Sequence, residues 1–143
     1  ASIDLTLGNV FRVFNEDIDI LHINTDDIDV SKIGRLVEIK DGECLILKPG
    51  QLVLGVTRER IYLPPNIAGW LTGRSRFARV GLMVHVTASF VQPNSMNRQV
   101  LEIINASHFR IALYPGVRVC QLILEETKGE TTLGGKFKYQ LEP

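Results

Sequence analysis

The chain has 143 residues, 45% of them hydrophobic and 22% charged, which is enough apolar material for one folded domain and argues against disorder. Its 16 Lys and Arg balance its 16 Asp and Glu, so no overall positive charge favours a nucleic acid polymer, whose binding depends on neutralising many phosphates. No apolar run reaches the roughly 18 residues of a membrane helix, and the first residues are not a signal peptide. We therefore expect a single domain over residues 1–143 that binds neither nucleic acid polymers nor membranes.

Short segments in which apolar and polar residues alternate recur along the chain, and this pattern is typical of half-buried β-strands. In chain order they are residues 3–7, 10–13, 18–23, 36–39, 44–47, 52–56, 60–63, 82–91, 99–105, 109–114 and 117–124. Turn-forming pairs such as Asp41-Gly42 and Pro115-Gly116 separate several of them. We expect a surface loop at the acidic residues 24–33 and a mobile C-terminal tail at residues 127–143. The number and spacing of the strands predict an all-β sandwich or barrel with little helix.

A basic segment interrupts this pattern at residues 73–79, which read Gly-Arg-Ser-Arg-Phe-Ala-Arg. In a helical turn, Ser75 and Arg79 lie on one side because they are four residues apart. Arg74 and Arg76 add positive charge where unpaired backbone N–H groups already favour phosphate. Taken alone, the same residues also fit a helix N-cap serine followed by solvated arginines. The segment is therefore a candidate phosphate site with an ordinary structural alternative.

Glu102 is the candidate catalytic acid or base. In a strand it shares one face with Val100 and Ile104, so we expect its carboxylate to be poorly hydrated. Such a group can accept and return a proton near neutral pH. The alternative is an exposed strand glutamate paired with a Lys or Arg.

The remaining titratable candidates do not indicate a metal site. Cys44 and Cys120 are far apart and belong to no C-x-x-C pair, so we expect two buried thiols rather than zinc ligands. His85 lies on the strand face opposite Val84 and Val86, which favours a hydrogen-bonded histidine in the core or at an interface.

Several separated segments together resemble the motifs of the dCTP deaminases, within the trimeric family that includes the dUTPases. They are residues 1–8 (Ala-Ser-Ile-Asp-Leu-Thr-Leu-Gly), 73–88, 100–102 (Val-Leu-Glu) and 114–116 (Tyr-Pro-Gly). The resemblance implies a distorted, jelly-roll-like β-barrel of the dUTPase type with one short helix. It further implies a cytoplasmic homotrimer with active sites between subunits, and a chain trimmed at both ends.

The resemblance also implies the chemistry. Glu102 would be the general base that activates a water to attack C4 of cytosine in dCTP, giving dUTP and ammonia, with Ser75 and Arg79 in support. The zinc deaminase signatures H-x-E and P-C-x-x-C do not occur, so we expect no zinc, and Mg²⁺ only through the substrate triphosphate. The expected substrate-binding residues are Arg74, Arg76, Phe77, Ala78, Ala88, Gln92, Val100, Leu101 and Lys138.

The chain departs from the family pattern at several positions. Gln92 stands where the family has an aspartate, which in dUTPases activates the hydrolytic water and in the deaminases contacts the sugar. A neutral amide cannot take that proton, which argues against dUTP hydrolysis. Arg76 replaces a more usual serine, a tyrosine is missing near Thr131, and Leu141-Glu142 replaces a Gly-Gln pair.

Three alternatives to a dUTP-forming deaminase stay open. The first is a bifunctional enzyme that also removes pyrophosphate, which Gln92 disfavours. The second is a nucleotide-binding trimer that has lost turnover, and the third is a purely structural β-domain. The sequence leaves open whether dTTP inhibits.

Overall fold

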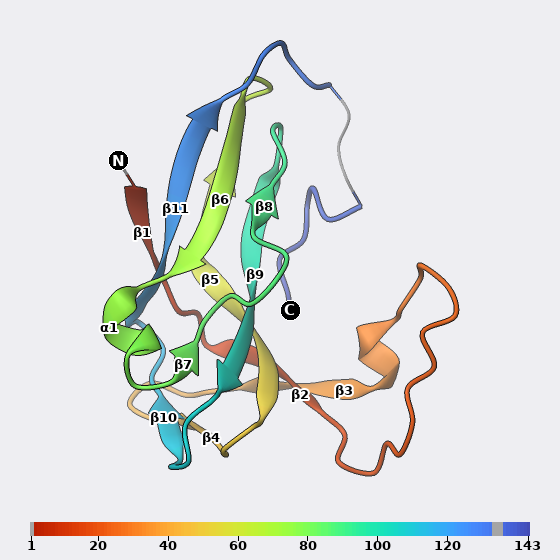
Figure 1. The fold of residues 1–143 in the computed structure, drawn as a ribbon, viewed down its shortest axis with the longest axis vertical. Coiled ribbons are helices and arrows are strands. Elements are labelled where there is room, and N and C mark those ends of the chain that lie inside the picture. The colour runs from red at the N-terminus through yellow and green to blue at the C-terminus, as the bar shows by residue number, and fades with distance from the viewer. Residues whose placement is uncertain (1, 133–135) are drawn as a thin grey trace.

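Antiparallel strands make up most of the protein in this computed structural model, which describes residues 2–132 and 136–143 (Figure 1). The elements are β1 Ser2–Thr6, β2 Val10–Phe14, the 3₁₀ turn η1 Val30–Lys32, β3 Gly34–Glu38, β4 Leu45–Leu47, β5 Leu52–Tyr62, β6 Ile67–Gly73, α1 Ser75–Ala78, β7 Leu82–Met83, β8 Phe90–Val91, β9 Met96–Asn105, β10 Ile111–Leu113 and β11 Arg118–Glu126. Among the described residues α1 is the one α-helical turn. The prediction of an all-β fold with a single short helix is confirmed.

The strands form two main sheets and one small pair. The larger sheet has the order β3-β2-β5-β9-β7, the smaller has the order β1-β11-β6-β8, and β4 pairs with β10. All of these pairings are antiparallel. In Figure 1, β11, β6 and β8 stand upright while β2 and β3 run across the lower part of the molecule.

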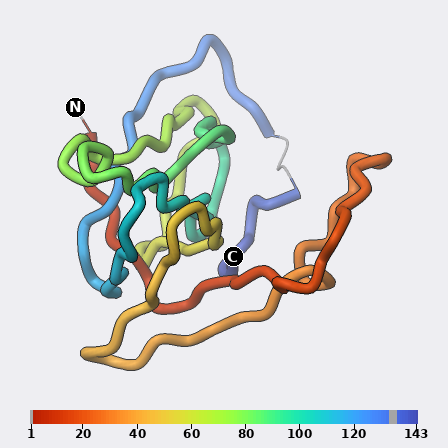
Figure 2. Tube along the Cα trace, turned by 60° about the horizontal axis from the view of Figure 1, so that its bottom comes forward, coloured from red at the N-terminus to blue at the C-terminus, as the bar shows by residue number. Residues whose placement is uncertain are grey.

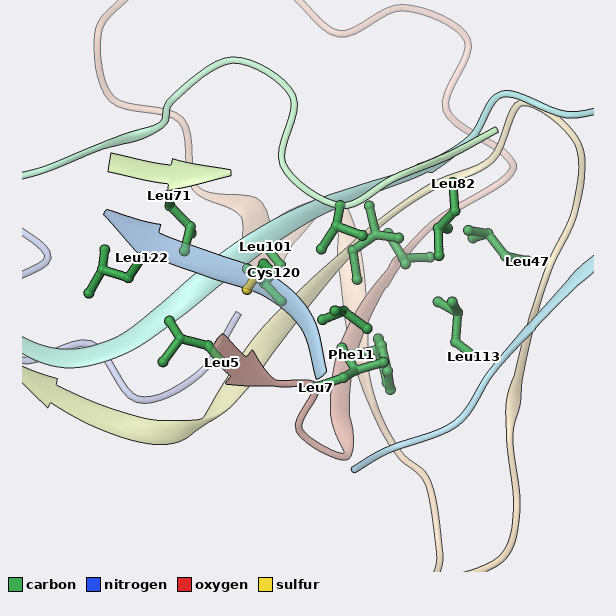
Figure 3. Close-up of a cluster of buried hydrophobic side chains, with 14 of the residues drawn as sticks. Leu5, Leu7, Phe11, Leu47, Leu71, Leu82, Leu101, Leu113, Cys120 and Leu122 are labelled. Carbon is green, nitrogen blue, oxygen red and sulfur yellow. The ribbon is translucent and has the colours of Figure 1, made fainter. Parts of the chain in front are cut away.

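The core lies between the inward faces of these sheets. Strand β9 shows why, because its odd-numbered residues are buried and its even-numbered residues are half-buried. Figure 3 shows the resulting cluster, to which β1, β2, β6, β9 and β11 contribute Leu5, Phe11, Leu71, Leu101, Cys120 and Leu122, while Leu7 joins it from just after β1. One face of β9 is thereby fixed against the core, and the other is free to line a site.

The strand predicted at residues 18–23 is wrong. Strands β2 and β3 pair directly, from Val10 with Glu38 to Phe14 with Gly34, so everything between them is the connection of one hairpin. No strand of the described chain lies alongside residues 18–23 to bond their backbone, and the apolar side chains of Ile18, Ile20, Leu21 and Ile23 are exposed. Figure 2 shows this connection, coloured red to orange, standing away from the strands. The loop predicted at 24–33 also contains the turn η1.

The predicted strand at 82–91 is also wrong, because it is two short strands in different sheets. Strand β7 pairs with β9 in the larger sheet, and β8 pairs with β6 in the smaller one. Residues 84–89 carry the chain from one sheet to the other. The predicted strands at 52–56 and 60–63 are instead the single long strand β5, whose register against β9 shifts between Val56 and Arg60.

Strand β6 was missed altogether, since two glycines and a preceding Pro-Pro pair obscure its alternation.

No helix among the described residues is long and apolar enough to cross a membrane.

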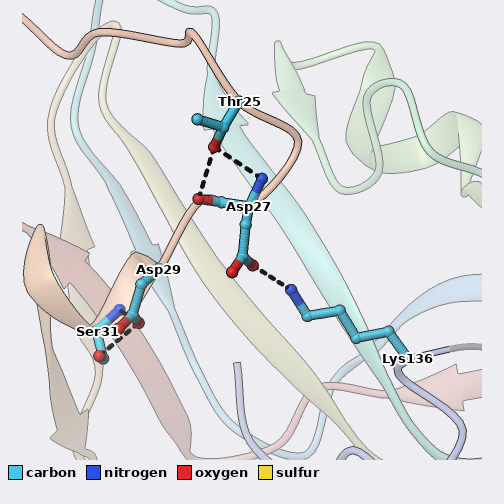
Figure 4. A network of polar contacts seen from close by, with 5 residues as sticks. All are labelled: Thr25, Asp27, Asp29, Ser31 and Lys136. Atoms are coloured by element: carbon cyan, nitrogen blue, oxygen red, sulfur yellow. Dashed lines mark hydrogen bonds and ion pairs between the residues drawn. The ribbon is translucent and has the colours of Figure 1, made fainter.

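The C-terminal segment, defined here as residues 136–143, lies against β9 and the 15–33 connection. The backbone N–H groups of Met96 and Arg98 donate to the carbonyls of Lys138 and Gln140, each at 3.0 Å. Lys136 Nζ lies 2.7 Å from Asp27 Oδ1, next to the turn in which Asp29 accepts from Ser31 (Figure 4). This segment, predicted as part of a mobile tail, thus has defined partners along its length.

Candidate active site

A cleft of about 420 Å³ opens along the half-buried face and free edge of β9. Its walls come from β5, β8, β9, the 84–89 crossing and the C-terminal segment. Among the lining residues are His85, Ala88, Gln92, Asn97, Arg98, Val100, Glu102 and Lys138. Five of the predicted catalytic and substrate-binding residues therefore share one cleft: Glu102, Ala88, Gln92, Val100 and Lys138.

Glu102 lies on the face of β9 that it shares with Val100 and Ile104, as predicted, and it is half-buried. Its Oε2 accepts the backbone N–H of Thr87 at 3.0 Å and lies 3.3 Å from the Thr87 hydroxyl, which also donates. No Lys or Arg among the described residues forms an ion pair with it. Two donors hold one carboxylate oxygen in place, which leaves the other oxygen to act on a bound molecule.

The edge of β9 that faces away from β5 is uncovered beside Glu102. At one end of the strand, Met96 and Arg98 are bonded to the C-terminal segment, and at the other end Ile104 and Asn105 pair with β7. No described strand covers the edge between them, at Val100 and Glu102. Backbone N–H groups of alternate residues point the same way, so the donors of both residues face the cleft. A planar heterocycle with donors and acceptors at its rim could bond there.

The crossing between the sheets forms the wall opposite this edge. His85 Nε2 lies 2.8 Å from the carbonyl oxygen of Ala88, so this nitrogen carries the proton and donates. The predicted hydrogen-bonded histidine is thus found, while its Nδ1 is buried with no partner among the described residues. The bond closes residues 85–88 into a turn that presents Thr87 to Glu102.

Arg12 fixes the end of the C-terminal segment. Its side chain is buried, and its Nε donates to the carbonyl of Pro143 at 2.9 Å. Nearer the cleft, Asn97 Nδ2 donates to the carbonyl of Phe137 at 2.7 Å. These bonds hold Lys138 at the cleft wall.

The basic turn does not reach this cleft within one chain. Arg74, Ser75, Arg76, Phe77, Ala78 and Arg79 are absent from its lining, because α1 packs against β7 beyond the far end of β9. Ser75, Arg76 and Arg79 are instead exposed.

The individual residues of α1 also differ from expectation. Ser75 is not the N-cap, since Arg74 holds that position without a side-chain capping bond. The guanidinium of Arg74 is occupied by the carbonyl of Arg118 at 2.9 Å and by Asp4 at 3.4 Å.

Leu101 lies behind the cleft rather than in its lining. Its side chain is 0% exposed in the core, and its backbone pairs with Gly55 of β5.

Sequence reasoning missed Thr87 and Arg98. Thr87 contacts Glu102 only because the chain turns at residues 85–88, and no periodicity signals such a turn. Arg98 could have been found, since positions 98, 100 and 102 share a strand face at a spacing of two. Among the described residues, no group of three or more His, Cys, Asp or Glu could hold a metal ion.

Known proteins resemble this chain over most of its length. Residues 1–127 match the model of a family described as dCTP deaminase-like. The dCTP deaminase of Marinomonas sp. (strain MWYL1) is 42% identical over 135 residues, which cover 90% of this chain and 70% of that protein. The dUMP-forming dCTP deaminase of Corynebacterium jeikeium (strain K411) is 39% identical over 150 residues, which cover all of this chain and 79% of that protein.

Solved structures support the fold. The 2'-deoxycytidine 5'-triphosphate deaminase from Agrobacterium tumefaciens matches 90% of this chain with a TM-score of 0.75 and 21% identity, and this chain spans 41% of that longer one. The native EIAV dUTPase matches with a TM-score of 0.54 and 18% identity over 95% of each chain. The predicted dUTPase-type fold is thereby confirmed.

Proposed function

Because the chain belongs to the dCTP deaminase-like family, we propose that it hydrolyses dCTP to dUTP and ammonia, without zinc, in the cytoplasmic deoxynucleotide pool. The observation that carries the proposal is the placement of Glu102 at the uncovered edge of β9, with one carboxylate oxygen held by Thr87. This arrangement puts a proton acceptor beside backbone groups that can bond the rim of a pyrimidine.

In the proposed reaction, the backbone at Val100 and Glu102 binds the cytosine edge, and the carboxylate of Glu102 activates a water. The water oxygen bonds to C4 as Glu102 takes one of its protons, and the bond from C4 to the exocyclic nitrogen then breaks. Glu102 returns protons during the reaction, so that one proton of the water ends on N3 of uracil and the other on ammonia. Ala88 lets the turn at 85–88 approach the reacting water closely.

A neighbouring subunit supplies the rest of the site in this proposal. Ser75 and Arg79 are exposed and do not line the cleft of their own chain, which suits residues that complete the site of another copy in a homotrimer. There Ser75 orients the water or the base, and the planar fork of Arg79 holds polar groups in place. Arg74, Arg76, Phe77 and Ala78 accompany them toward the triphosphate, which carries Mg²⁺. Gln92 and Lys138 contact the sugar and the phosphates.

A dUMP-forming enzyme is the second candidate, because several relatives carry that name. Gln92 argues against it, since an amide cannot deprotonate a water for attack on the triphosphate. Chromatography of the products from dCTP distinguishes the two, because dUTP supports the first candidate and dUMP with pyrophosphate supports the second.

The substitution Glu102→Gln tests the proposed chemistry. It removes the proton acceptor at nearly constant volume, so we expect ammonia release from dCTP to fall by about 10²–10⁴-fold. Calorimetry should still detect dCTP binding, because the strand edge and the cations are unchanged. Glu126→Gln, on the exposed end of β11, is the matched control and should keep full activity.

Two outcomes would contradict the proposal. Near-normal ammonia release from Glu102→Gln would remove this residue as the base. Tight dCTP binding by the unaltered protein without any ammonia would instead favour a nucleotide-binding trimer that has lost turnover.

A further inference from the structure

Two arginines face each other directly across β5 and β9. Arg60 pairs with Arg98 in the strand register, and both side chains belong to the face that carries Glu102. Like charges opposed in this way destabilise a sheet. Neither arginine forms an ion pair with any Asp or Glu of the described chain. An anion from outside the chain would offset the repulsion.

Lys138 adds a third cation at the same end of the cleft. Its carbonyl is bonded to Met96 N–H, two residues from Arg98, and both Lys138 and Arg98 line the cleft. Its Nζ lies 5.3 Å from the centroid of the Tyr139 ring. Lys138 likewise has no acidic partner in the part of the chain that the structure describes. The three residues Arg60, Arg98 and Lys138 form what we term the basic cluster. Arg98 and Lys138 line the cleft, whereas Arg60 is exposed beside it and acts through its charge on the position that Arg98 occupies.

The basic cluster and Glu102 lie at a distance that suits the two ends of a nucleotide. Arg98 and Glu102 are four residues apart on one strand, which corresponds to roughly 13 Å at about 3.3 Å per residue. This is the scale of an extended nucleoside triphosphate, measured from its base to its last phosphate. A pyrimidine at the uncovered edge of β9 would therefore point its phosphates along the strand toward Arg98.

We propose that the basic cluster binds the polyphosphate of the nucleotide whose base meets Glu102, and that Arg98 thereby makes the site selective for triphosphates over monophosphates. This inference rests on the proposed function for its choice of nucleotide. Arg98 supplies a planar fork that can bond two phosphate oxygens, Arg60 adds charge from the neighbouring strand, and Lys138 closes over them. The basic turn at α1, by contrast, acts from another subunit.

Inorganic tripolyphosphate tests the binding site without any chemistry. In a thermal unfolding assay it should raise the Tm of the unaltered protein, and inorganic monophosphate at the same concentration should raise it much less. Arg98→Gln should reduce this shift by more than half and Arg60→Gln, which does not line the cleft, by less, while each raises the Tm measured without ligand by relieving the repulsion. The matched control is Arg110→Gln, which makes the same charge change at an exposed position that neither lines the cleft nor pairs with Arg98, and it should leave the ligand-induced shift unaltered.

Steady-state kinetics tests the selectivity. For Arg98→Gln we expect the KM for dCTP to rise by about tenfold or more, with kcat within about threefold and no change in the KM for dCMP, because one charge-assisted contact to the outer phosphates is lost. Equal KM values for dCTP in Arg98→Gln and the unaltered protein, or an equal tripolyphosphate shift in both, would overturn the inference.

The two proposals fail in different ways. If tripolyphosphate binding depends on Arg98 but no ammonia is released from dCTP, the basic cluster stands and the deaminase proposal fails. If ammonia is released and Arg98→Gln changes neither binding nor KM, the deaminase proposal stands and the basic cluster fails.

Discussion

Cys120 shows at the scale of a single residue how burial controls reactivity. Burial, together with the nearby carboxylates of Glu59 and Asp4, raises the pKa of its thiol to about 12 from an ordinary value of 9.0. Thiol reagents attack the thiolate, and a rise of this size makes the thiolate roughly a thousandfold rarer near neutral pH. Cys44 is only half-buried, contrary to the prediction of two buried thiols.

We therefore predict that one thiol reacts in the native protein and two react after unfolding. In a Cys44→Ser variant at pH 8, an aromatic disulfide reagent should label nothing until denaturant is added, and then label one thiol per chain. Rapid labelling of the native variant would mean that β11 opens readily or that Cys120 is reached from solvent. The Cys120→Ser variant is the control and should react without denaturant.

At the scale of elements, the joint between α1 and β7 depends on Gly81. Its φ of +85° lies in the left-handed region, and a Cβ added there would come within 2.9 Å of the Ser107 backbone nitrogen. Ser107 cannot easily move, because its N–H and hydroxyl both donate to the fully buried Asn105. The direction in which α1 leaves the sheet is thus fixed by one close contact.

Gly81→Ala should lower the free energy of unfolding by about 2–4 kcal/mol, since a left-handed backbone cost adds to a steric clash. Gly42→Ala is the matched control, because Gly42 has a φ of +80° and no atom within 4 Å of the added Cβ. It should cost only about 1 kcal/mol, from the backbone conformation alone. Urea unfolding of both variants measures the difference, and equal losses would show that Ser107 yields to the new methyl group.

At the scale of the whole molecule, one chain leaves large apolar side chains exposed. Trp70 packs edge-to-face on Phe90, with ring centroids 5.0 Å apart, and lies directly across from Ile123 on β11. All three side chains are more than a third exposed. Contiguous apolar surface of this kind is typical of an interface, which fits the proposed homotrimer.

Mixing two inactive variants tests whether the active site lies between subunits. Glu102→Gln and Arg79→Gln should each be inactive alone, because each lacks one part of every site. If a site takes Glu102 from one copy and Arg79 from the next, about a quarter of the sites in randomly assembled trimers have both residues intact. Co-refolding the variants in equal amounts should therefore restore about a quarter of the unaltered activity.

Mixing the two variants in their folded state is the control for the co-refolding experiment. Mixing the folded variants without unfolding them should restore little activity if subunits exchange slowly. Co-refolded mixtures that stay inactive would place Glu102 and Arg79 in the same chain's site, or remove one of them from the chemistry.

The sequence by itself determined that the fold is almost entirely β, that residues 73–79 contain a short basic helical turn, and on which face of β9 Glu102 lies. These properties are local: alternation with a period of two assigns faces, and turn residues mark where strands end. It also shows that Arg98 is a basic residue with no acidic residue next to it in the chain. The connection at 18–23 shows the limit of such reasoning, because alternation cannot reveal that no strand lies alongside.

Only the tertiary structure decided which separated residues meet. Thr87 reaches Glu102 because the chain crosses between sheets at 84–89, and Arg60 opposes Arg98 because β5 and β9 pair in one particular register. It also separated the basic turn from the cleft of its own chain, since α1 extends past β7. The physical reason is that the pairing of strands and the paths of their connections depend on packing between segments far apart in sequence, which no local pattern encodes.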